Sequence, residues 1–84
     1  MKTVHKYPFR IGDPSFSMPQ DAELLCVQMQ GDMPCLWALV ETDNPMVTRR
    51  IKIRGTGHDC SGVGRYISTF QMAGGALVFH AFEE

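Results

Sequence analysis

The segment RGTGHDCSGVG, residues 54–64, holds the side chains of this chain that are best suited to chemistry. His58, Asp59, Cys60 and Ser61 follow one another there, among several glycines. A cysteine and a histidine act as nucleophile and base only when their side chains lie within about 3 Å and a third group orients the base. Neighbours in one loop lack a rigid element that would hold this geometry, and Asp and Ser in loops usually bond their own backbone. We therefore expect no catalytic residue and a non-enzymatic protein.

The soft metal ligands are scattered along the chain. None of the three cysteines and three histidines stands at CxxC, HxH or HExxH spacing, so we predict no metal site and no cofactor. The loop also lacks the third glycine of a GxGxxG phosphate-binding turn. A glycine-rich turn can still form an anion-binding nest of N–H groups. An alternative function is therefore binding of a small anionic ligand or a single-stranded nucleic acid by the Gly55–Gly64 loop, with these residues: Gly55, Thr56, Gly57, His58 and the flanking Arg54 and Arg65.

Length and composition indicate one small domain, residues 1–84, that is 44% hydrophobic with a net charge of −1. This charge argues against nucleic acid and against an acidic membrane surface as partners. No apolar run approaches the roughly 18 residues of a membrane span, and the N-terminus has no apolar signal region. Without an export signal, the cysteines are expected to be reduced thiols in the cytoplasm.

The hydrophobic pattern alternates with a period of two, which is typical of strands with one buried face. Residues 23–30 and 35–41 flank the turn-type segment GDMP, and their predicted hairpin register makes these pairs: Leu25 with Val40, Val27 with Ala38, Met29 with Leu36. Residues 66–73 and 76–84 flank Gly74-Gly75, which suits a two-residue hairpin turn. That register pairs two further sets of residues: Phe70 with Phe79, Met72 with Leu77.

Residues 48–54, TRRIKIR, predict a strand with a buried face and a basic face. Val47, Ile51 and Ile53 share the buried face, with Arg49 as an exception on it. The N-terminal residues 3–9 predict an edge strand, because Pro8 has no N–H to donate. A further short strand is expected around Phe16. The fold class is thus all-β: a small antiparallel β-sandwich or half-open barrel of five to six strands joined by hairpins.

A recognition surface is predicted if residues 35–40 pair with residues 47–53 through the TDNP turn. Trp37 would then lie beside Arg50, and Cys35 beside Lys52, on the face away from the core. We predict a protein-binding surface that contains the following residues: Trp37, Arg50, Lys52 and Arg54. Alternatively, Trp37 and Leu39 pack beneath a second sheet and the basic stripe only contacts solvent. A homodimer that buries Trp37 or pairs edge strands is a further expectation.

Two other predictions concern single features. His80 should lie opposite Thr69 as a hydrogen-bonded structural residue, and it could pair with His5 if the terminal strands are adjacent. The segment Gly62–Gly64 is expected to be a flexible, loosely packed part of the loop.

Five motifs together resemble a family of short uncharacterised proteins from tailed bacteriophages and prophages: KTVHKYPF, CLWALV, GTGH, YISTFQ and GGALVFHAFEE. The resemblance implies an origin and not an activity, and it supplies no catalytic residues to carry over. Because phage-like accessory genes often encode small domains that bind and modulate a host protein, we expect a non-enzymatic accessory protein in the cytoplasm of a host bacterium, which binds a host or phage protein and modulates host defence or metabolism. The family pattern often has a proline after the GTGH histidine, where this chain has Asp59. Cys60 is therefore a poor candidate nucleophile.

Overall fold

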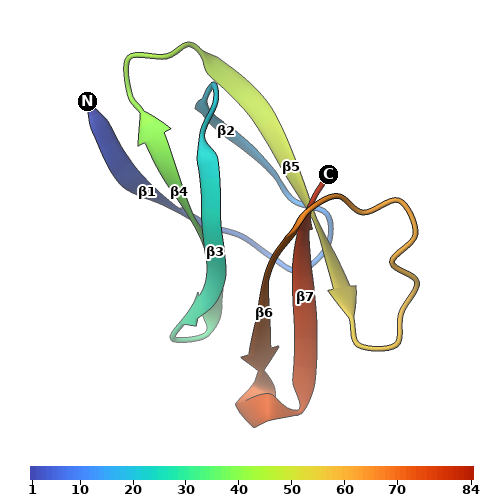
Figure 1. The fold of residues 1–84 in the computed structure, drawn as a ribbon. Helices are drawn as coiled ribbons and strands as arrows, with labels where there is room; N and C mark the ends of the chain where they lie inside the picture. Colours follow the sequence, from blue (N-terminus) through green and yellow to red (C-terminus); the bar gives the residue numbers. More distant parts are fainter.

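The computed structural model describes residues 1–84, which form seven strands and one short 3-10 turn. The elements are β1 Lys2–Pro8, β2 Ser15–Pro19, β3 Glu23–Gln30, β4 Met33–Glu41, β5 Met46–Gly55, β6 Tyr66–Met72, η1 Ala73–Gly75 and β7 Leu77–Glu83. They make two antiparallel sheets, which we call sheet 1 (order β1-β4-β3) and sheet 2 (order β2-β5-β7-β6) (Figure 1). The predicted all-β fold is confirmed, with seven strands in place of five to six. No helix in the structure is long enough to cross a membrane.

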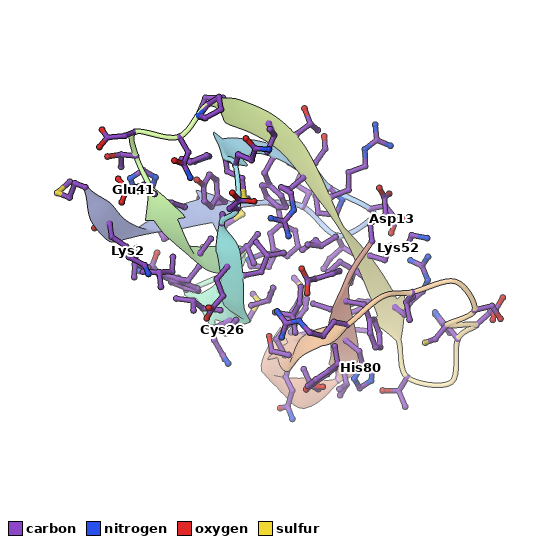
Figure 2. The ribbon with its side chains drawn as sticks, turned by 45° about the horizontal axis from the view of Figure 1, so that its top comes forward. Lys2, Asp13, Cys26, Glu41, Lys52 and His80 are labelled. Atoms are coloured by element: carbon purple, nitrogen blue, oxygen red, sulfur yellow. The ribbon has the colours of Figure 1, made fainter.

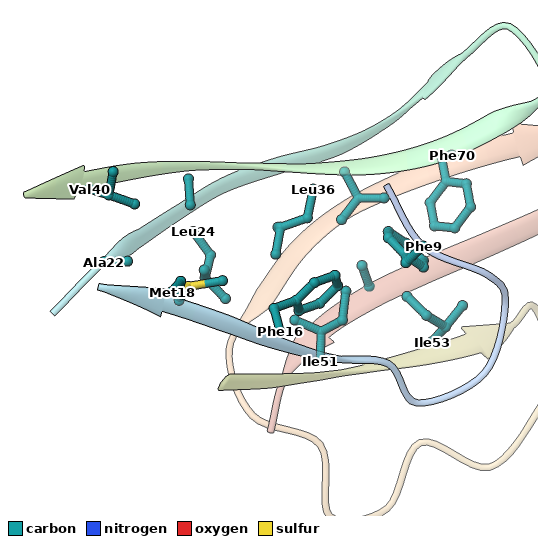
Figure 3. Packing of buried hydrophobic residues seen from close by; sticks show 13 residues of the cluster. Phe9, Phe16, Met18, Ala22, Leu24, Leu36, Val40, Ile51, Ile53 and Phe70 are labelled. Carbon is teal, nitrogen blue, oxygen red and sulfur yellow. The ribbon is translucent and has the colours of Figure 1, made fainter. Parts of the chain in front are cut away.

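The core lies between the two sheets and is built by the alternating apolar positions (Figure 3). On β4, Leu36, Ala38 and Val40 are buried and face sheet 2. From sheet 2, Met18 and Ile51 face them and are equally buried. Because each such side chain gains about 1.5–3 kcal/mol on burial, this alternation sets which face of each strand turns inward.

The β3–β4 hairpin differs from its predicted register by two residues. Its loop is only Gly31 and Asp32, with Gly31 at φ 59°, so Gln30 pairs with Met33. Consequently Val27 faces Leu36 and Met29 faces Pro34. A bulge at Leu25 then shifts the strand by one position, so Leu24 is buried and Leu25 is 39% exposed. A shift of two residues preserves the buried face, and the bulge changes it for the residues that precede it.

Strands β4 and β5 do not pair, so the predicted pairing through the TDNP turn is wrong. After Glu41 the chain crosses to sheet 2, where β5 pairs with β2 and β7. The crossing loop is fixed to the end of β2, because Gln20 N–H donates to Pro45 O at 2.8 Å and Asn44 Nδ2 donates to Gln20 O at 2.9 Å. Trp37 is therefore not beside Arg50, and Cys35 is not beside Lys52.

The C-terminal hairpin has the predicted register. Phe70 faces Phe79, with ring centroids 5.8 Å apart, and Met72 faces Leu77. The N–H of Ala76 donates to Ala73 O at 3.1 Å, and Gly74 and Gly75 have φ values of 65° and 93°. Positive φ at both central residues is what a two-residue hairpin turn requires.

Side chains, and not a backbone ladder, join the two sheets where β3 and β6 meet. Ser68 Oγ on β6 accepts from Val27 N–H at 2.6 Å and donates to Val27 O at 2.8 Å. On the other side of the sandwich, β1 is the terminal strand of sheet 1, as predicted for an edge strand. Since β1 and β7 belong to different sheets, His5 and His80 are not on adjacent strands, and the condition for a pair between them is not met.

Candidate functional site

The predicted binding surface is divided between the two outer faces of the sandwich. Trp37 lies on the outer face of sheet 1, because it alternates with the buried Leu36 and Ala38. Arg50, Lys52 and Arg54 lie on the outer face of sheet 2, because they alternate with the buried Ile51 and Ile53. The four residues therefore do not form one surface. The error follows from the pairing of β4 with β5, which the structure does not have.

The outer face of sheet 1 carries a central apolar group that we call the Trp37 face: Val4, Cys26, Trp37 and Leu39. The strand registers place Cys26 beside Trp37 from β3, and Val4 beside Leu39 from β1. Trp37 and Leu39 are half-buried by their strand neighbours, and Val4 is 48% exposed. Sheet 2 packs against the opposite face, so the alternative in which Trp37 and Leu39 lie beneath a second sheet is wrong.

Charged side chains border the Trp37 face. Lys2 and Lys6 lie on the β1 side, and Glu23 and Glu41 lie on β3 and β4 (Figure 2 labels Lys2, Cys26 and Glu41). Lys6 Nζ donates to Gln30 Oε1 at 2.6 Å, and this bond spans β4, which lies between the two strands. An apolar centre with a charged border is the arrangement found in protein interfaces.

All three cysteines are free thiols. Cys26 pairs with Trp37 and Cys35 pairs with Gln28, so the two thiols stand in different rows of the face.

One of the three cations in the basic stripe on sheet 2 is paired with a carboxylate. Arg54 Nη1 lies 2.9 Å from Asp13 Oδ1, and this hydrogen bond lowers the pKa of the Asp13 carboxyl (Figure 2 labels Asp13 and Lys52). Lys52 Nζ donates to Gly62 O at 3.3 Å. Arg50 is exposed and has no carboxylate partner. This leaves a weaker positive field than the sequence suggests.

The GTGH motif forms one compact turn. The N–H of His58 donates to Gly55 O at 3.0 Å, and Gly57 has a φ of 84°, which the third residue of a type II turn requires. The imidazole folds back over Gly55, where an added Cβ would lie 3.0 Å from two ring atoms. Thr56 Oγ1 lies 2.7 Å from His80 Nε2, which fastens the turn to β7. The motif thus shapes a turn, as its glycines predict.

The rest of the loop holds no catalytic pair. Asp59 Oδ1 accepts from the N–H and the hydroxyl of Ser61 at 2.9 and 2.6 Å, and these bonds lower the pKa of Asp59. The Cys60 thiol contacts the His58 carbonyl oxygen at 3.5 Å, and no contact joins it to the imidazole. Asp and Ser therefore bond within the loop, as predicted. No three His, Cys, Asp or Glu residues gather in a metal-binding arrangement.

Gly64 is packed tightly, so the prediction that it belongs to a loosely packed segment is wrong. Its N–H donates to Glu83 O at 2.7 Å, and an added Cβ would lie 2.7 Å from the same oxygen. The next residue, Arg65, donates from Nε to Glu83 Oε2 at 2.6 Å and from Nη2 to Leu24 O at 3.4 Å. This end of the loop is therefore tied to β7 and β3.

Arg65 belongs to a structural cluster that the sequence did not reveal. Arg49 Nη2 lies 3.0 Å from Glu83 Oε1, and its Nη1 donates to Ala22 O at 3.0 Å. One half-buried carboxylate thus holds two arginines, both of which also bond backbone carbonyls at the start of β3. Arg49 is the polar exception on the buried face of β5, and this exception was the only signal in the sequence for the cluster.

His80 is a hydrogen-bonded structural residue opposite Thr69, as predicted (Figure 2 labels His80). Its Nδ1 lies 2.9 Å from Thr69 Oγ1, and that hydroxyl lies 2.8 Å from the Tyr66 hydroxyl. With Thr56 at the other ring nitrogen, both imidazole nitrogens are occupied. The chain of four polar residues fixes the GTGH turn to sheet 2.

Comparison with known proteins identifies a family but no relative of known activity. Over residues 1–84 the chain matches the family described as Domain of unknown function (DUF7352). No curated protein and no solved structure matches it. Because the match covers every residue, the chain belongs to this family of domains of unknown function.

Proposed function

We propose that this protein is a non-enzymatic accessory protein of phage or prophage origin, which binds a host or phage protein through the Trp37 face in the cytoplasm of a bacterium. The observation that carries this proposal is the position of Trp37 and Leu39 on the outer face of sheet 1, where no other element covers them. Trp is the residue type most enriched among the energetic centres of protein interfaces.

The size of this face suggests what the partner must contact. Three strands about 4.8 Å apart and some eight residues long give a face of roughly 14 by 26 Å. This is about 370 Å², or close to half of the roughly 800 Å² that each partner contributes to a standard interface. The proposed partner therefore extends beyond the Trp37 face, onto the charged border or the edge of the sheet.

The proposed phage origin is supported by the five motifs that resemble tailed-phage and prophage proteins. Small accessory domains of this kind act by binding and modulating a host protein, including defence or metabolic proteins.

The alternative, an anionic ligand or single-stranded nucleic acid at the Gly55–Gly64 loop, has weaker support. Its two flanking arginines, Arg54 and Arg65, are bound to the carboxylates of Asp13 and Glu83. Nucleic-acid binding at this loop would be salt-sensitive, since each phosphate contact releases counterions. Absence of binding to single-stranded DNA, RNA or nucleotides at low salt would remove this alternative.

Affinity capture tests the proposal. The protein, tagged at the C-terminus, is used with lysates of infected or lysogenic cells, and the bound proteins are identified by mass spectrometry. We expect to find a partner whose binding is saturable, and Trp37→Ala should lower the affinity for this partner at least tenfold. Tyr66→Ala is the matched control, because Tyr66 is a 52% exposed aromatic on the outer face of sheet 2. Equal capture by the two variants would contradict the proposal.

The capture assay also separates the two halves of the predicted surface. Arg50→Glu with Lys52→Glu changes only sheet 2, so we expect it to leave capture unchanged. Light scattering at two concentrations tests the homodimer. A Trp37-dependent dimer in place of a captured partner would show that the face serves self-association.

A further inference from the structure

We propose that the open edge of β1 receives an extended acidic segment of the partner as an additional strand of sheet 1. This inference rests on the proposed function and deepens it, because it states which part of the protein the partner contacts beyond the Trp37 face. Strand addition to a sheet edge is a common mode of peptide recognition, in which main-chain hydrogen bonds give affinity and side chains give specificity.

The hydrogen bonds at both ends of β1 show which backbone groups are free. Thr42 N–H donates to Met1 O at 2.9 Å, and Phe9 N–H donates to Pro34 O at 3.0 Å. Odd-numbered residues of β1 therefore turn their backbone groups toward β4. In an antiparallel ladder the residues between them turn theirs the other way. The N–H and C=O groups that face the open edge belong to Lys2, Val4 and Lys6.

The other open edges of the sandwich are protected. The β3 edge is joined to β6 by Ser68. Beside β5, Asp13 Oδ1 accepts from Ile53 N–H at 3.4 Å, and Arg54 Nη1 donates to Ile53 O at 2.9 Å. β2 has only five residues and ends in a proline. Short length and side-chain caps on backbone groups hinder strand addition at these edges. β1 also ends in a proline, Pro8, but it has seven residues, leaves the backbone groups of Lys2, Val4 and Lys6 free, and packs as a strand only against β4.

The charges on β1 select the occupant. Lys2, Val4 and Lys6 are exposed on one face, and neither lysine has a carboxylate partner. If a second copy paired antiparallel with Val4 opposite Val4, Lys2 would oppose Lys6 in both halves, and like charges directly opposite each other are destabilising. A segment with acidic residues two positions before and after an apolar residue turns the same contacts into attraction. The edge therefore fits an acidic strand better than a second copy.

An added strand would also enlarge the Trp37 face. Its outward side chains would lie next to Val4, in the row that continues to Leu39 and Glu23. Sheet 1 would then have four strands on this side, and its outer face would grow by about a third. The edge and the face are thus one continuous contact region.

The test uses the whole protein labelled with 15N and four blocked peptides as probes. The parent peptide, acetyl-TETVTET-amide, places its glutamates opposite the two lysines when its valine faces Val4. The second peptide carries lysines in place of glutamates. The third is the parent N-methylated at its glutamates and valine, which removes the N–H groups that face β1. N-methylation at the two central threonines is the matched control, because those groups face away.

We expect the parent peptide to shift the amide signals of Lys2, Val4 and Lys6 and to slow their hydrogen exchange. The lysine peptide should bind at least about tenfold more weakly, because two charge pairs change from attraction to repulsion. Lys2→Glu with Lys6→Glu should reverse this preference. Any one of three results would overturn the inference. The first is that the parent peptide leaves the β1 amide signals unchanged, and the second is that the glutamate and lysine peptides bind equally well. The third is that the peptide N-methylated at its glutamates and valine binds as well as the parent.

The capture assay separates this inference from the proposed function. If Lys2→Glu with Lys6→Glu leaves capture of the partner unchanged while Trp37→Ala abolishes it, the edge inference fails and the proposed function stands. If neither variant affects capture, the proposed function fails. Loss of capture in both variants, together with the peptide results, supports both.

Discussion

Ser68 is predicted to hold the two sheets together at the junction of β3 and β6. Its hydroxyl makes two bonds with Val27, at 2.6 Å to the N–H and 2.8 Å to the carbonyl oxygen. Each neutral hydrogen bond contributes about 1 kcal/mol net, and partial hydration of this half-buried site lowers the loss. Ser68→Ala should therefore reduce the free energy of unfolding by about 1.5 kcal/mol. For a domain of this size that corresponds to a fall in Tm of roughly 6–12 °C.

Chemical denaturation followed by circular dichroism measures this loss directly. Ser17→Ala is the control, because Ser17 is an exposed strand serine of β2 whose hydroxyl makes no hydrogen bond, and we expect its effect to stay within about 0.5 kcal/mol. Ser68→Thr keeps the hydroxyl and should retain most of the stability. A loss for Ser68→Ala no larger than that of Ser17→Ala would refute the role of this residue as the link between the sheets.

Three further predictions concern the loop and its surroundings. Gly64→Ala should lower the free energy of unfolding by about 1–3 kcal/mol, because the added Cβ would lie 2.7 Å from a β7 carbonyl oxygen. Thermal denaturation measures this loss, and an unchanged Tm would contradict the close packing. Gly55→Ala should displace the imidazole of His58, which would be seen as a change in its NMR signals. It should lower the free energy of unfolding less in a His58→Ala background than in the wild type. Equal losses of stability in the two backgrounds would show that the ring does not pack over Gly55. The arginine beside Asp13 lowers the pKa of that carboxyl, so the charged form contributes stability above its unfolded pKa near 3.9, and this contribution is lost as pH falls through the lower folded pKa. Asp13→Asn should thus destabilise the protein by less than about 1 kcal/mol at pH 7, with a difference that shrinks below about pH 4; a difference that is constant from pH 7 to pH 2 would contradict this ion pair.

The sequence pattern predicted the strands well because alternation reports burial directly. Residues 23–30 and 66–72 are strands, and the Gly74-Gly75 turn sets the register of the last hairpin as expected. The register of the first hairpin differs from the predicted one because the segment GDMP can form either a four-residue or a two-residue loop. Both loops keep Val27 on the buried face, so the hydrophobic pattern alone does not distinguish them.

The strand order could not be predicted because alternation shows which face is buried and not which strand lies alongside. Val40 and Val47 point inward whether β4 and β5 form a hairpin or cross between sheets. The contacts that decide this, between Gln20 and the crossing loop, join residues far apart in the sequence. The binding surface was divided for the same reason.

The residues that tie the structure together were the hardest to foresee. Ser68 and Arg65 are ordinary polar residues in sequence, and their importance comes from Val27 and Glu83, which are distant along the chain. By contrast, the conclusion that His80 is structural followed from its place between apolar strand residues. Local chemistry was thus predictable, whereas links between sheets depended on topology.

Accessibility of the single tryptophan, in the free protein and in the complex, tests the central claim most directly. Acrylamide quenching of its fluorescence is measured on the monomer and after addition of the captured partner. Our account predicts that Trp37 is quenched in the monomer and that the partner protects it by several fold. Quenching that is unchanged in the complex, or a Trp37 already shielded in the monomer, would contradict the proposal that the Trp37 face is the binding surface.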